Sequence, residues 1–583
     1  MCRICGLIDF SGKLPVETSV ITMRDSMSRG GPDDAGIFVD GRVGLGHRRL
    51  SIIDLSPGGH QPMKATSRAV WLTFNGEIYN FRELKKELSS LGHVFNSTSD
   101  TEVLLNSYLQ WGEAAFGKFI GMFSFAIYDR DKSLFYLVRD HAGIKPLYYS
   151  IDEEKLVFAS EVRAIKKLNP DWPENSAWRV LFLAFGHLPA PYTTLKNVLT
   201  LPKQSFFRLD LSSRKSEIKG YQAPLFSPIN SLDAAVNSIR EEFPAAITRH
   251  LISDAPIGVF LSGGVDSSLI ASLAHRVHGD NLRTLSIVFN EQAYSEEKYQ
   301  KIVTDKLKCH HESFLVTEKD FLESLPDIFS AMDQPSSDGV NTYFISKFAR
   351  NAGLKAVLSG LGADEMFGGY ASFTRIGKLS AVKRFPRLAG FAGSLAGGKF
   401  NRLSYMSTEG NSGVYLTLRG IFTGQEISRL LDMDVSEIHK LVGKIDFQEP
   451  ETIGAQYASR METDLYMHNQ LLKDTDCMSM WHSLEIRVPF LDTRFAGIVS
   501  SVNPAIKFHA STPKSLLLKS FSQQLPKELY TRPKMGFTFP FNDWIANNPT
   551  VFGGIDNASS GHWSKVWTAY VLKVFPAGNK PIA

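Results

Sequence analysis

The apolar residues of the first two hundred positions follow a different pattern from those of the rest of the chain. Short β-branched and aromatic runs, such as AVWLTFNGEIYN and GMFSFAIYDRDKSLFYLVRD, are separated by Gly, Pro and Asp. Such runs predict strands and hairpins. Helices are expected over Phe81 to Leu91 and over Asp100 to Trp111. An α+β domain is therefore predicted for this part of the chain.

Beyond about residue 250, apolar strands alternate with helices. The runs APIGVFL, RTLSIVF and LKAVLSG predict strands, and SSLIASLAHRVH and SEEKYQKIVTDKL predict helices. Strands that alternate with helices indicate a mainly parallel sheet covered on both faces. From about Ala371 onward the pattern is mostly helical, and the Gly- and Ser-rich stretch 387–413 is expected to be a mobile loop.

A polar, turn-rich interval separates the two patterns. Its sequence, LSSRKSEIKGYQAPLFSPINS, is typical of a boundary between two cores. The chain has 583 residues, which is more than one hydrophobic core usually serves. We therefore expect domains at 1–210 and 235–583, joined by a linker at 211–234.

Charge and cysteine content argue against several classes of function. The 64 Lys and Arg residues and 60 Asp and Glu residues leave a net charge of +4, and no long basic run suggests contact with nucleic acid or a membrane surface. Four scattered cysteines do not form a disulfide framework, which favours a reducing compartment. The sequence has no apolar run of about 18 residues. Its start does not read as a signal peptide, so a cytoplasmic location is expected.

The segment GVFLSGGVDSSLI predicts a phosphate-binding loop between a strand and a helix. Its glycines permit close approach of a ligand, while helix-start amides and Ser hydroxyls attract phosphate oxygens. The loop lacks the Gly-Lys-Ser/Thr of a Walker A motif. Asp266 would repel phosphate unless a divalent cation lay between them, so Mg²⁺ is implied. The alternative is a capped strand-to-helix turn without a ligand.

A second acidic loop, VLSGLGADEMFGGY, follows another predicted strand. It places Asp364 and Glu365 at the carboxyl end of the same sheet, where ligands of open α/β sheets bind. Together, SGGVDSS and SGLGADEMFGGY resemble the synthetase domain of the asparagine synthetase family, which belongs to the ATP-pyrophosphatase class. DTDCMSMWHSLEIRVPFLD and PKSLLLKSF are similar to further motifs of that family, and the resemblance covers nearly the whole chain.

This resemblance implies a fold, a reaction and a set of ligand contacts. The fold would be an α+β N-terminal nucleophile (Ntn) glutaminase domain with sandwiched antiparallel sheets, followed by an α/β ATP-pyrophosphatase domain with a parallel sheet and a helical C-terminal part. ATP would activate a carboxylate as an acyl-adenylate, and ammonia would then attack the acyl carbon. The implied ATP contacts are Leu261, Ser262, Gly263, Gly264, Asp266, Ser267, Ser268, Val288, Ser359 and Gly360. Asp266 and Asp364 would bind Mg²⁺, and Lys514 would stabilise the departing pyrophosphate.

The first residues, MCRICGLIDF, are similar to the Met-Cys-Gly-Ile start of the same family. Loss of Met1 would leave Cys2 with a thiol and a free α-amino group of pKa about 7.7 to 8.0, which is suited to take the thiol proton. The thiolate would attack the side-chain amide of glutamine and release ammonia. A metal or redox pair with Cys5 is disfavoured, because residues three apart on a strand point to opposite faces.

The resemblance also implies how glutamine is bound. Arg49 matches the residue that binds the glutamine α-carboxylate. Asn75 and Gly76 in FNGEIYN match the oxyanion hole. Glu77 and Asp100 would bind the substrate α-amino group. The expected partners are glutamine, ATP and an acceptor carboxylate, and a homodimer is common in the family.

Two departures from the family pattern bear on the reaction. Arg3 replaces a Gly beside the nucleophile, and Leu361 replaces a Glu that the family assigns to the acceptor side. Aspartate, which would give asparagine, is the expected acceptor, and another carboxylate such as a sugar uronic acid is the alternative. A β-lactam-synthetase-like enzyme, a non-catalytic homologue and a glutaminase regulated by its second domain are further alternatives.

Overall fold

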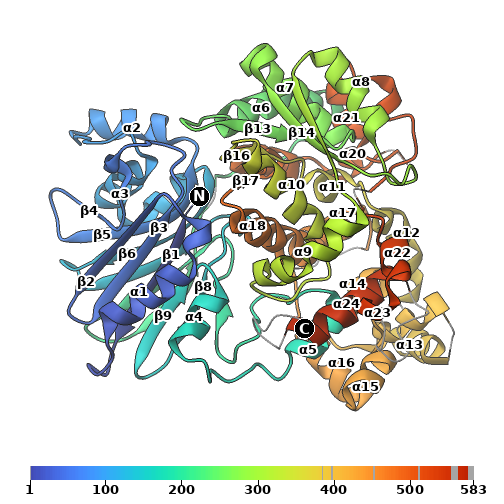
Figure 1. The fold of residues 1–583 in the computed structure, drawn as a ribbon, viewed down its shortest axis with the longest axis horizontal. Coiled ribbons are helices and arrows are strands. Elements are labelled where there is room, and N and C mark those ends of the chain that lie inside the picture. Colours follow the sequence, from blue (N-terminus) through green and yellow to red (C-terminus); the bar gives the residue numbers. More distant parts are fainter. Residues whose placement is uncertain are drawn as a thin grey trace.

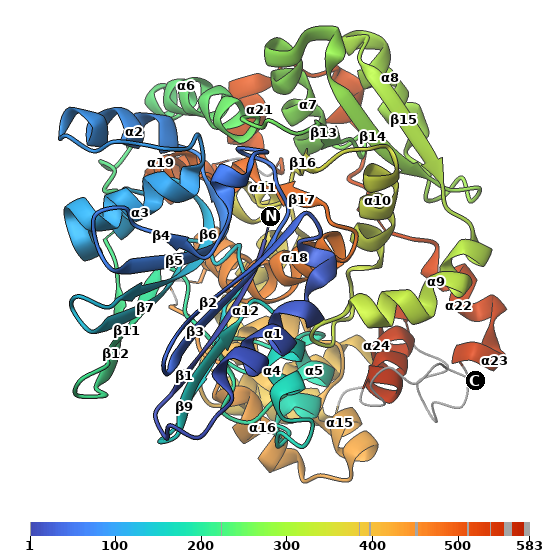
Figure 2. The same cartoon turned by 60° about the vertical axis from the view of Figure 1, so that its left-hand side comes forward.

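The computed structural model describes residues 2–575, apart from 223, 384, 396–397, 449, 451–452, 510–511, 537 and 553–561. Two halves lie side by side, with the N-terminal strands on the left of Figure 1 and the rest of the chain on the right. The N-terminal end lies at the boundary between the halves in both Figure 1 and Figure 2. None of the described helices has the length and apolar character needed to span a membrane.

The N-terminal half contains two six-stranded antiparallel sheets stacked face to face (Figure 2). In spatial order, the first sheet contains β10 (Leu199–Thr200), β8 (Tyr148–Ile151), β9 (Lys155–Ala159), β1 (Arg3–Asp9), β3 (Val43–Arg49) and β2 (Asp34–Asp40). The second contains β12 (Ser216–Gly220), β11 (Ser205–Asp210), β7 (Leu134–Arg139), β6 (Gly121–Asp129), β5 (Val70–Ile78) and β4 (Met63–Lys64). Ile4, Leu45 and Phe135 are buried between the sheets.

Helices cover the outer faces of this sandwich, which explains why its central strands are buried on both sides. The first sheet is covered by α1 (Val16–Ser26) and α4 (Val162–Leu168), and the second by α2 (Phe81–Ser90) and α3 (Asp100–Trp111). The helices expected over Phe81 to Leu91 and Asp100 to Trp111 are thus present. The interval 211–234 contains β12, which pairs with β11, and the start of the next helix at Leu232.

The C-terminal half is built on a five-stranded parallel sheet. In spatial order its strands are β15 (His310–Leu315), β14 (Arg283–Val288), β13 (Ile257–Phe260), β16 (Ala356–Leu358) and β17 (Glu485–Arg487). The helices that alternate with them are α6 (Leu232–His250), α7 (Val265–His278), α8 (Glu297–Leu307), α9 (Glu318–Ala331), α10 (Val340–Asn351) and α11 (Ala363–Phe367). The predicted fold classes of both halves are confirmed.

Helices follow the sheet to the C-terminal end. They are α12 (Ala371–Val382), α13 (Pro386–Leu395), α14 (Ser412–Arg419), α15 (Gly424–Leu431), α16 (Val435–Gly443), α17 (Ala455–Met461), α18 (Leu472–Trp481), α19 (Thr493–Ser501), α20 (Pro504–Lys507), α21 (Ser515–Phe521), α22 (Phe541–Asn547), α23 (Pro549–Phe552) and α24 (Trp563–Val574). A π-helical turn segment, η6 (Glu462–Leu471), joins α17 to α18 in one continuous helix. The 3₁₀ segment η5 (Gly398–Ser407) lies between α13 and α14.

The expectation of a mobile loop over 387–413 is wrong, because this stretch contains α13, η5 and the start of α14. Its glycines serve close packing: a Cβ at Gly393 would lie 2.4 Å from the backbone nitrogen of Ser404 in η5. Tyr405 is fully buried and donates a 2.7 Å hydrogen bond to the carbonyl of Phe422. Composition alone suggested flexibility where the glycines let two helical segments approach each other.

One helix of the first 210 residues packs against the C-terminal helices. Helix α5 (Trp178–Phe185) contacts α14, α15, α16 and α24, and it appears among them at the bottom of Figure 1. Its apolar face is continuous with the core of the C-terminal half. Leu50, Ile52 and Met122 from the sandwich also join that core. The two halves are therefore joined by an apolar interface as well as by the chain.

Candidate active sites

Cys2 lies immediately before β1, at the boundary between the halves. Its side chain is buried, and its backbone nitrogen donates a 3.2 Å hydrogen bond to Oδ1 of Asn75. Burial raises the pKa of the thiol to about 11, although a backbone hydrogen bond from Leu50 and the charge of Arg49 act in the opposite direction. A thiol in this environment needs a base beside it to become a nucleophile.

Asn75 and Gly76 lie on β5, where the strand pairs with β6. Asn75 is fully buried, and its Nδ2 has no hydrogen-bond partner among the described residues. Gly76 has φ +152°, and a Cβ there would lie only 2.1 Å from the carbonyl oxygen of Met122. A buried N–H donor without a partner is available to a ligand oxygen, and donors of this kind form oxyanion holes.

Two buried carboxylates lie close to this strand. Asp100, at the start of α3, accepts a 2.9 Å hydrogen bond from the backbone nitrogen of Ile78. Burial raises the pKa of Asp100 to about 6. Burial and the nearby Glu485 also raise the pKa of Glu77, whose Oε2 accepts no hydrogen bond from any described residue. A cationic ligand group such as an α-ammonium would compensate both carboxylates.

Arg49, the last residue of β3, is buried and contacts a neighbouring loop. Its Nη1 donates a 2.8 Å hydrogen bond to the carbonyl of Ser56, and its Nη2 donates to the carbonyls of Ile53 and Asp54. A Cβ at Gly59 would lie 1.9 Å from the same Nη2. In this structure the guanidinium is thus held by backbone carbonyls, and its charge acts on the Cys2 thiol.

Arg487 is a further member of this site, and no sequence motif connects it to Cys2. It lies on β17 of the parallel sheet, is fully buried, and contacts Glu485 at 2.5 Å and Glu77 at 3.5 Å. Its Nη1 also donates to the carbonyls of His250 and Ile252. The EIRVPFLD motif carries this residue, but only the fold brings it next to β5. The C-terminal half therefore contributes a cation to the N-terminal site.

The second site surrounds the loop between β13 and α7. Gly263 has φ +81°, a conformation that favours glycine. Ser262 and Ser267 are linked by a 3.0 Å contact between their hydroxyl oxygens, and the backbone nitrogen of Gly264 donates to Ser262. The buried Oγ of Ser268 has no hydrogen-bond partner among the described residues. This loop leaves a hydroxyl and helix-start amides for an anion.

Lys514 joins the two acidic loops of this site. It lies before α21, is buried, and forms ion pairs with Asp266 and, at 2.6 Å, with Asp364. Lys534 also contacts Asp364 at 2.6 Å. Burial raises the pKa of Asp266, whereas Lys514 and Lys534 lower the pKa of Asp364 despite its burial. The expected proximity of Asp266, Asp364 and Lys514 is therefore present.

A cavity of about 280 Å³, which we call the sheet-edge cavity, opens at the carboxyl ends of β13, β14 and β16. The expected ATP contacts that line it are Leu261, Ser262, Gly264, Asp266, Ser267, Ser359 and Gly360, together with Asp364. On β14, its described lining residues are Leu285, Ser286 and Ile287. Val288 lies one position further on, and its carbonyl accepts from the backbone nitrogen of Val316. Leu361 also lines this cavity.

The residues present fit a magnesium ion that also contacts phosphate. No cluster of three or more His, Cys, Asp or Glu side chains in the described part of the chain is arranged as a complete metal site. Oδ1 of Asp266 is buried and accepts no hydrogen bond from a described residue. Mg²⁺ is usually bound by one or two carboxylates together with substrate phosphates. Asp266 and Asp364 supply that set of carboxylates.

Two cations near the C-terminal end complete the sheet-edge site. Arg532 donates to the carbonyl of Gly263 at 3.1 Å, forms an ion pair with Glu296 and lies over the ring of Tyr299. Lys534 donates to the carbonyl of Gly369 at 3.0 Å. Both come from the RPK stretch, which the sequence pattern did not connect to the phosphate loop. The fold brings Arg532 next to a residue 269 positions away and Lys534 next to one 165 positions away.

A second cavity of about 210 Å³, the aromatic cavity, shares Asp338 and Asn341 with the sheet-edge cavity. Aromatic rings dominate its lining: Phe185, Tyr415, Tyr466, Phe539, Phe541 and Trp563. Arg419 also lines it, pairs with Glu462 at 2.6 Å and lies 3.8 Å from the centre of the Tyr466 ring. This cavity could not be predicted from the sequence, because its walls come from both halves and from η6.

Comparison with known proteins identifies the family. Residues 1–222 match the model of a glutamine amidotransferase domain, and residues 238–551 match that of asparagine synthase. The glutamine-hydrolyzing asparagine synthetases 1 and 3 of Bacillus subtilis (strain 168) are similar to this chain. The first is 32% identical over 93% of this chain and 88% of its own length, and the second is 30% identical over 92% and 86%. The amidase chry2 of Gibberella zeae is 25% identical over 90% of this chain and 85% of its own length.

These matches agree with the two sites. The amidotransferase match covers the half that carries Cys2, and the asparagine synthase match covers the half that carries the sheet-edge cavity. The family uses ATP, and the chain is a glutamine-hydrolysing, carbon–nitrogen bond-forming ligase of this type. The chain belongs to the asparagine synthase family and carries an N-terminal glutamine amidotransferase domain.

Proposed function

We propose that this enzyme moves the amide nitrogen of glutamine to a carboxylate activated by ATP, with aspartate as the first acceptor to test. Cys2 attacks the glutamine amide, ammonia leaves, and water cleaves the resulting thioester to glutamate. At the second site the acceptor carboxylate attacks the α-phosphorus of ATP, and pyrophosphate leaves. Ammonia then attacks the acyl carbon, and AMP leaves as the amide forms.

The contact between Cys2 and Asn75 is the observation that carries this proposal. Oδ1 of Asn75 holds the Cys2 nitrogen at 3.2 Å, while its Nδ2 is buried and free of described partners. Nδ2 and the backbone N–H of Gly76 would bind the negative oxygen that develops on the amide carbon. After loss of Met1, the α-amino group of Cys2 would accept the thiol proton. Arg49 would bind the glutamine α-carboxylate, and Glu77 and Asp100 its α-ammonium group.

The second half of the proposal rests on the sheet-edge cavity. The phosphate chain of ATP would lie along the 262–268 loop, and the nucleoside would contact Leu261, Val288, Ser359 and Gly360. Mg²⁺, held by Asp266 and Asp364, would neutralise phosphate charge. Lys514 carries a pKa raised by both carboxylates despite its burial, so it stays protonated and can stabilise the leaving pyrophosphate.

A second candidate acceptor is a carboxylate on a larger, ring-bearing body such as a uronic acid. Leu361 places an uncharged side chain in the sheet-edge cavity, and the adjoining aromatic cavity offers rings and the cationic Arg419. The C–H faces of sugar rings pack against aromatic side chains. The Gibberella zeae relative is named as an amidase, whereas the Bacillus subtilis relatives are named as asparagine synthetases.

The experiment is a pyrophosphate-release assay with ATP, Mg²⁺ and glutamine. Aspartate is tested first, followed by a panel of carboxylates, and mass spectrometry detects the loss of about one mass unit when OH becomes NH₂. Activity with aspartate supports an asparagine synthetase. Activity only with a larger acid supports the second candidate.

Two variants separate the two sites. Cys2→Ala should abolish glutamine-dependent amide formation but retain synthesis from added ammonium. Asp266→Asn should stop synthesis from both nitrogen sources, because it acts on the ATP side. If added ammonium fails to restore synthesis by Cys2→Ala, two separate sites are excluded.

A further inference from the structure

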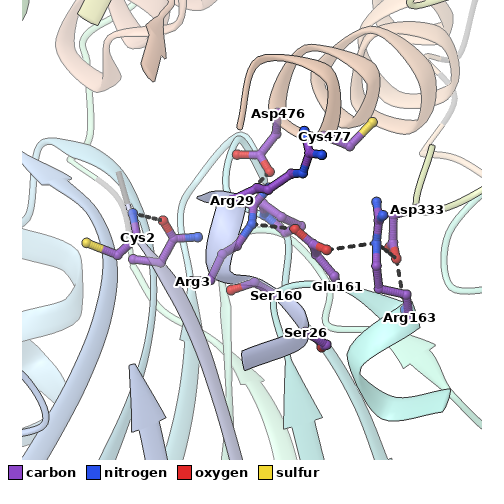
Figure 3. Close-up of polar contacts among 12 residues, drawn as sticks. Cys2, Arg3, Ser26, Arg29, Ser160, Glu161, Arg163, Asp333, Asp476 and Cys477 are labelled. Atoms are coloured by element: carbon purple, nitrogen blue, oxygen red, sulfur yellow. Dashed lines mark hydrogen bonds and ion pairs between the residues drawn. The ribbon is translucent and has the colours of Figure 1, made fainter. Parts of the chain in front are cut away.

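Arg3, the residue next to the nucleophile, is held by carboxylates from both halves of the molecule. Its side chain is fully buried. Nε contacts Glu161 of the N-terminal half at 2.7 Å, and Nη1 contacts Asp476 on α18 at 2.8 Å. Figure 3 shows Arg3 between these two carboxylates, with Cys2 beside it. The position of the strand that carries Cys2 is therefore tied to α18.

Asp476 has a second cationic partner besides Arg3. The second carboxylate oxygen of Asp476 contacts Nζ of Lys145 at 3.2 Å. Although burial acts in the opposite direction, Arg3 and Lys145 lower the pKa of Asp476. Separating the two partners of a buried ion pair costs free energy, so Arg3 and Asp476 are expected to move together.

The helix that carries Asp476 also forms part of the sheet-edge cavity. Asp474 and Thr475 line that cavity, and the next residue contacts Arg3. Asp474 accepts a 2.6 Å hydrogen bond from Ser336. Three consecutive residues of α18 thus connect the ATP side to the residue beside Cys2.

A small cavity lies along the same connection. Arg3, Glu161 and Asp476 line it, and so does Asp474, which it shares with the sheet-edge cavity. Its volume is about 30 Å³, which is enough to hold a water molecule. Nη2 of Arg3 is buried without a hydrogen-bond partner among the described residues. Arg3 therefore occupies the space between the two sites.

We infer that Arg3 is a positioning residue whose ion pair with Asp476 couples occupancy of the ATP site to the reactivity of Cys2. This inference rests on the proposed function. ATP bound in the sheet-edge cavity would contact Asp474 and Thr475 and shift α18, and the Asp476–Arg3 contact would then move the start of β1 relative to Asn75. Glutamine is then hydrolysed fastest when the second site is occupied.

The test measures glutamate formation from glutamine with and without ATP and Mg²⁺. In the wild-type protein the ratio of the two rates should be at least about fivefold, the lower end of typical coupling between sites. Arg3→Met and Asp476→Asn should reduce this ratio to about one-fold. Arg3→Lys, which keeps a cation near Asp476, should restore part of it. Melting temperatures identify any variant that is unfolded, and Asp476→Asn serves if Arg3→Met does not fold.

Lys355→Met provides the matched control. Lys355 also forms an ion pair across the halves, at 2.7 Å from Asp33, but it lies outside α18. This variant should keep the wild-type ratio, and a loss there equal to that of Arg3→Met would contradict a specific path through α18. A wild-type ratio of one, or an unchanged ratio in both Arg3→Met and Asp476→Asn, also overturns the inference.

These outcomes are separate from a failure of the proposed function. A wild-type protein that hydrolyses no glutamine and releases no pyrophosphate with any acid of the panel contradicts the proposed function itself. A protein that performs both reactions, but whose Arg3→Met variant keeps the stimulation, contradicts only the coupling through Arg3.

Discussion

Asn75 uses the two ends of one amide group for different tasks. Its oxygen holds the backbone nitrogen of Cys2, and its buried Nδ2, which has no partner among the described residues, would bind the substrate in the proposed reaction. Asn75→Ala should therefore lower kcat for glutamine hydrolysis about 10²- to 10³-fold, the usual effect of removing one oxyanion-hole donor. Steady-state glutamate formation checks this. Synthesis from added ammonium is the control, and an equal loss there would point to misfolding instead.

Asp100 gives the glutamine site a pH dependence. Burial is the main cause of its pKa of about 6, Glu485 raises it further, and Arg487 and the amide of Ile78 act in the opposite direction. The carboxylate is protonated below that pKa, so the attraction that we propose between Asp100 and the α-ammonium of glutamine would be lost as the pH falls through about 6. We expect kcat/KM for glutamine to decrease below this pH.

A pH profile of both nitrogen sources checks the role of Asp100. In the proposed function, synthesis from ammonium does not use this carboxylate. Measured at a constant concentration of free NH₃, its profile should therefore lack the change near pH 6. Asp100→Asn should flatten the glutamine profile near pH 6 at a low level of activity. A variant whose profile still falls at the wild-type pH would assign the acid limb to another group, with Glu77 as the nearest candidate.

At the scale of elements, Gly76 is required for the pairing of β5 with β6. Gly76→Ala would place a Cβ 2.1 Å from the carbonyl oxygen of Met122, at a φ of +152°. Neither group is the end of a flexible side chain, so the strands must separate. We expect a loss of more than about 2 kcal/mol in the free energy of unfolding, together with loss of glutamine hydrolysis.

A glycine that also has a positive φ, but has open space around its Cβ position, is the control for this substitution. Gly41 lies in the turn between β2 and β3 at φ +57°, with no atom within 4 Å of its Cβ position. Gly41→Ala should cost only about 1 to 2 kcal/mol, from the backbone conformation alone. Urea unfolding measures both variants. Equal losses would show that the contact with β6 is not the cause.

The helix from α17 through η6 to α18 contributes to all three cavities. Tyr466 lines the aromatic cavity, Asn469 the small cavity beside Arg3, and Leu471 the sheet-edge cavity. The π-helical turns of η6 are wider than those of an α-helix. The side chains of η6 therefore point in directions that the 3.6-residue period of an α-helix does not predict. Such segments are frequent at functional sites.

The elements that sequence predicted well are those with a strong local pattern. Apolar residues that recur every two residues or every 3.6 residues predicted the strands and helices around the 262–268 loop, and the helices near Phe81 and Asp100. Sequence did not predict that α5 joins the C-terminal helices, or that 387–413 is helical. The first depends on long-range packing, and the second was obscured by glycines that serve close contacts.

The same distinction applies to the candidate sites. Cys2, Asn75, Asp266 and Asp364 stand in short motifs whose chemistry can be interpreted before folding. Arg487 and Arg532, Lys145 beside Asp476 and the aromatic cavity could not be predicted, because each depends on a contact between distant segments. Motifs identify the reacting groups, and the fold decides which charges surround them.

At the scale of the whole molecule, Arg487 links the parallel sheet to the glutamine site. It is fully buried between Glu485 and Glu77, so Arg487→Met would leave two buried carboxylates without their cation. We expect a loss of about 3 to 5 kcal/mol in the free energy of unfolding. Glutamine hydrolysis should fall as well, because the pKa of Glu77 would rise further. Urea unfolding and glutamate formation measure the two effects.

Arg494→Met is the matched control, because Arg494 also forms an ion pair across the halves. Its contact with Glu83, at 3.1 Å, is between side chains that are 39% and 60% exposed. Solvent screens such a pair, so its loss should cost no more than about 1 kcal/mol. If both variants lose equal stability, the stability of the interface between the halves depends on the number of ionic contacts across it. If only Arg487→Met is destabilised, they depend on the buried cation that joins the parallel sheet to the nucleophile domain.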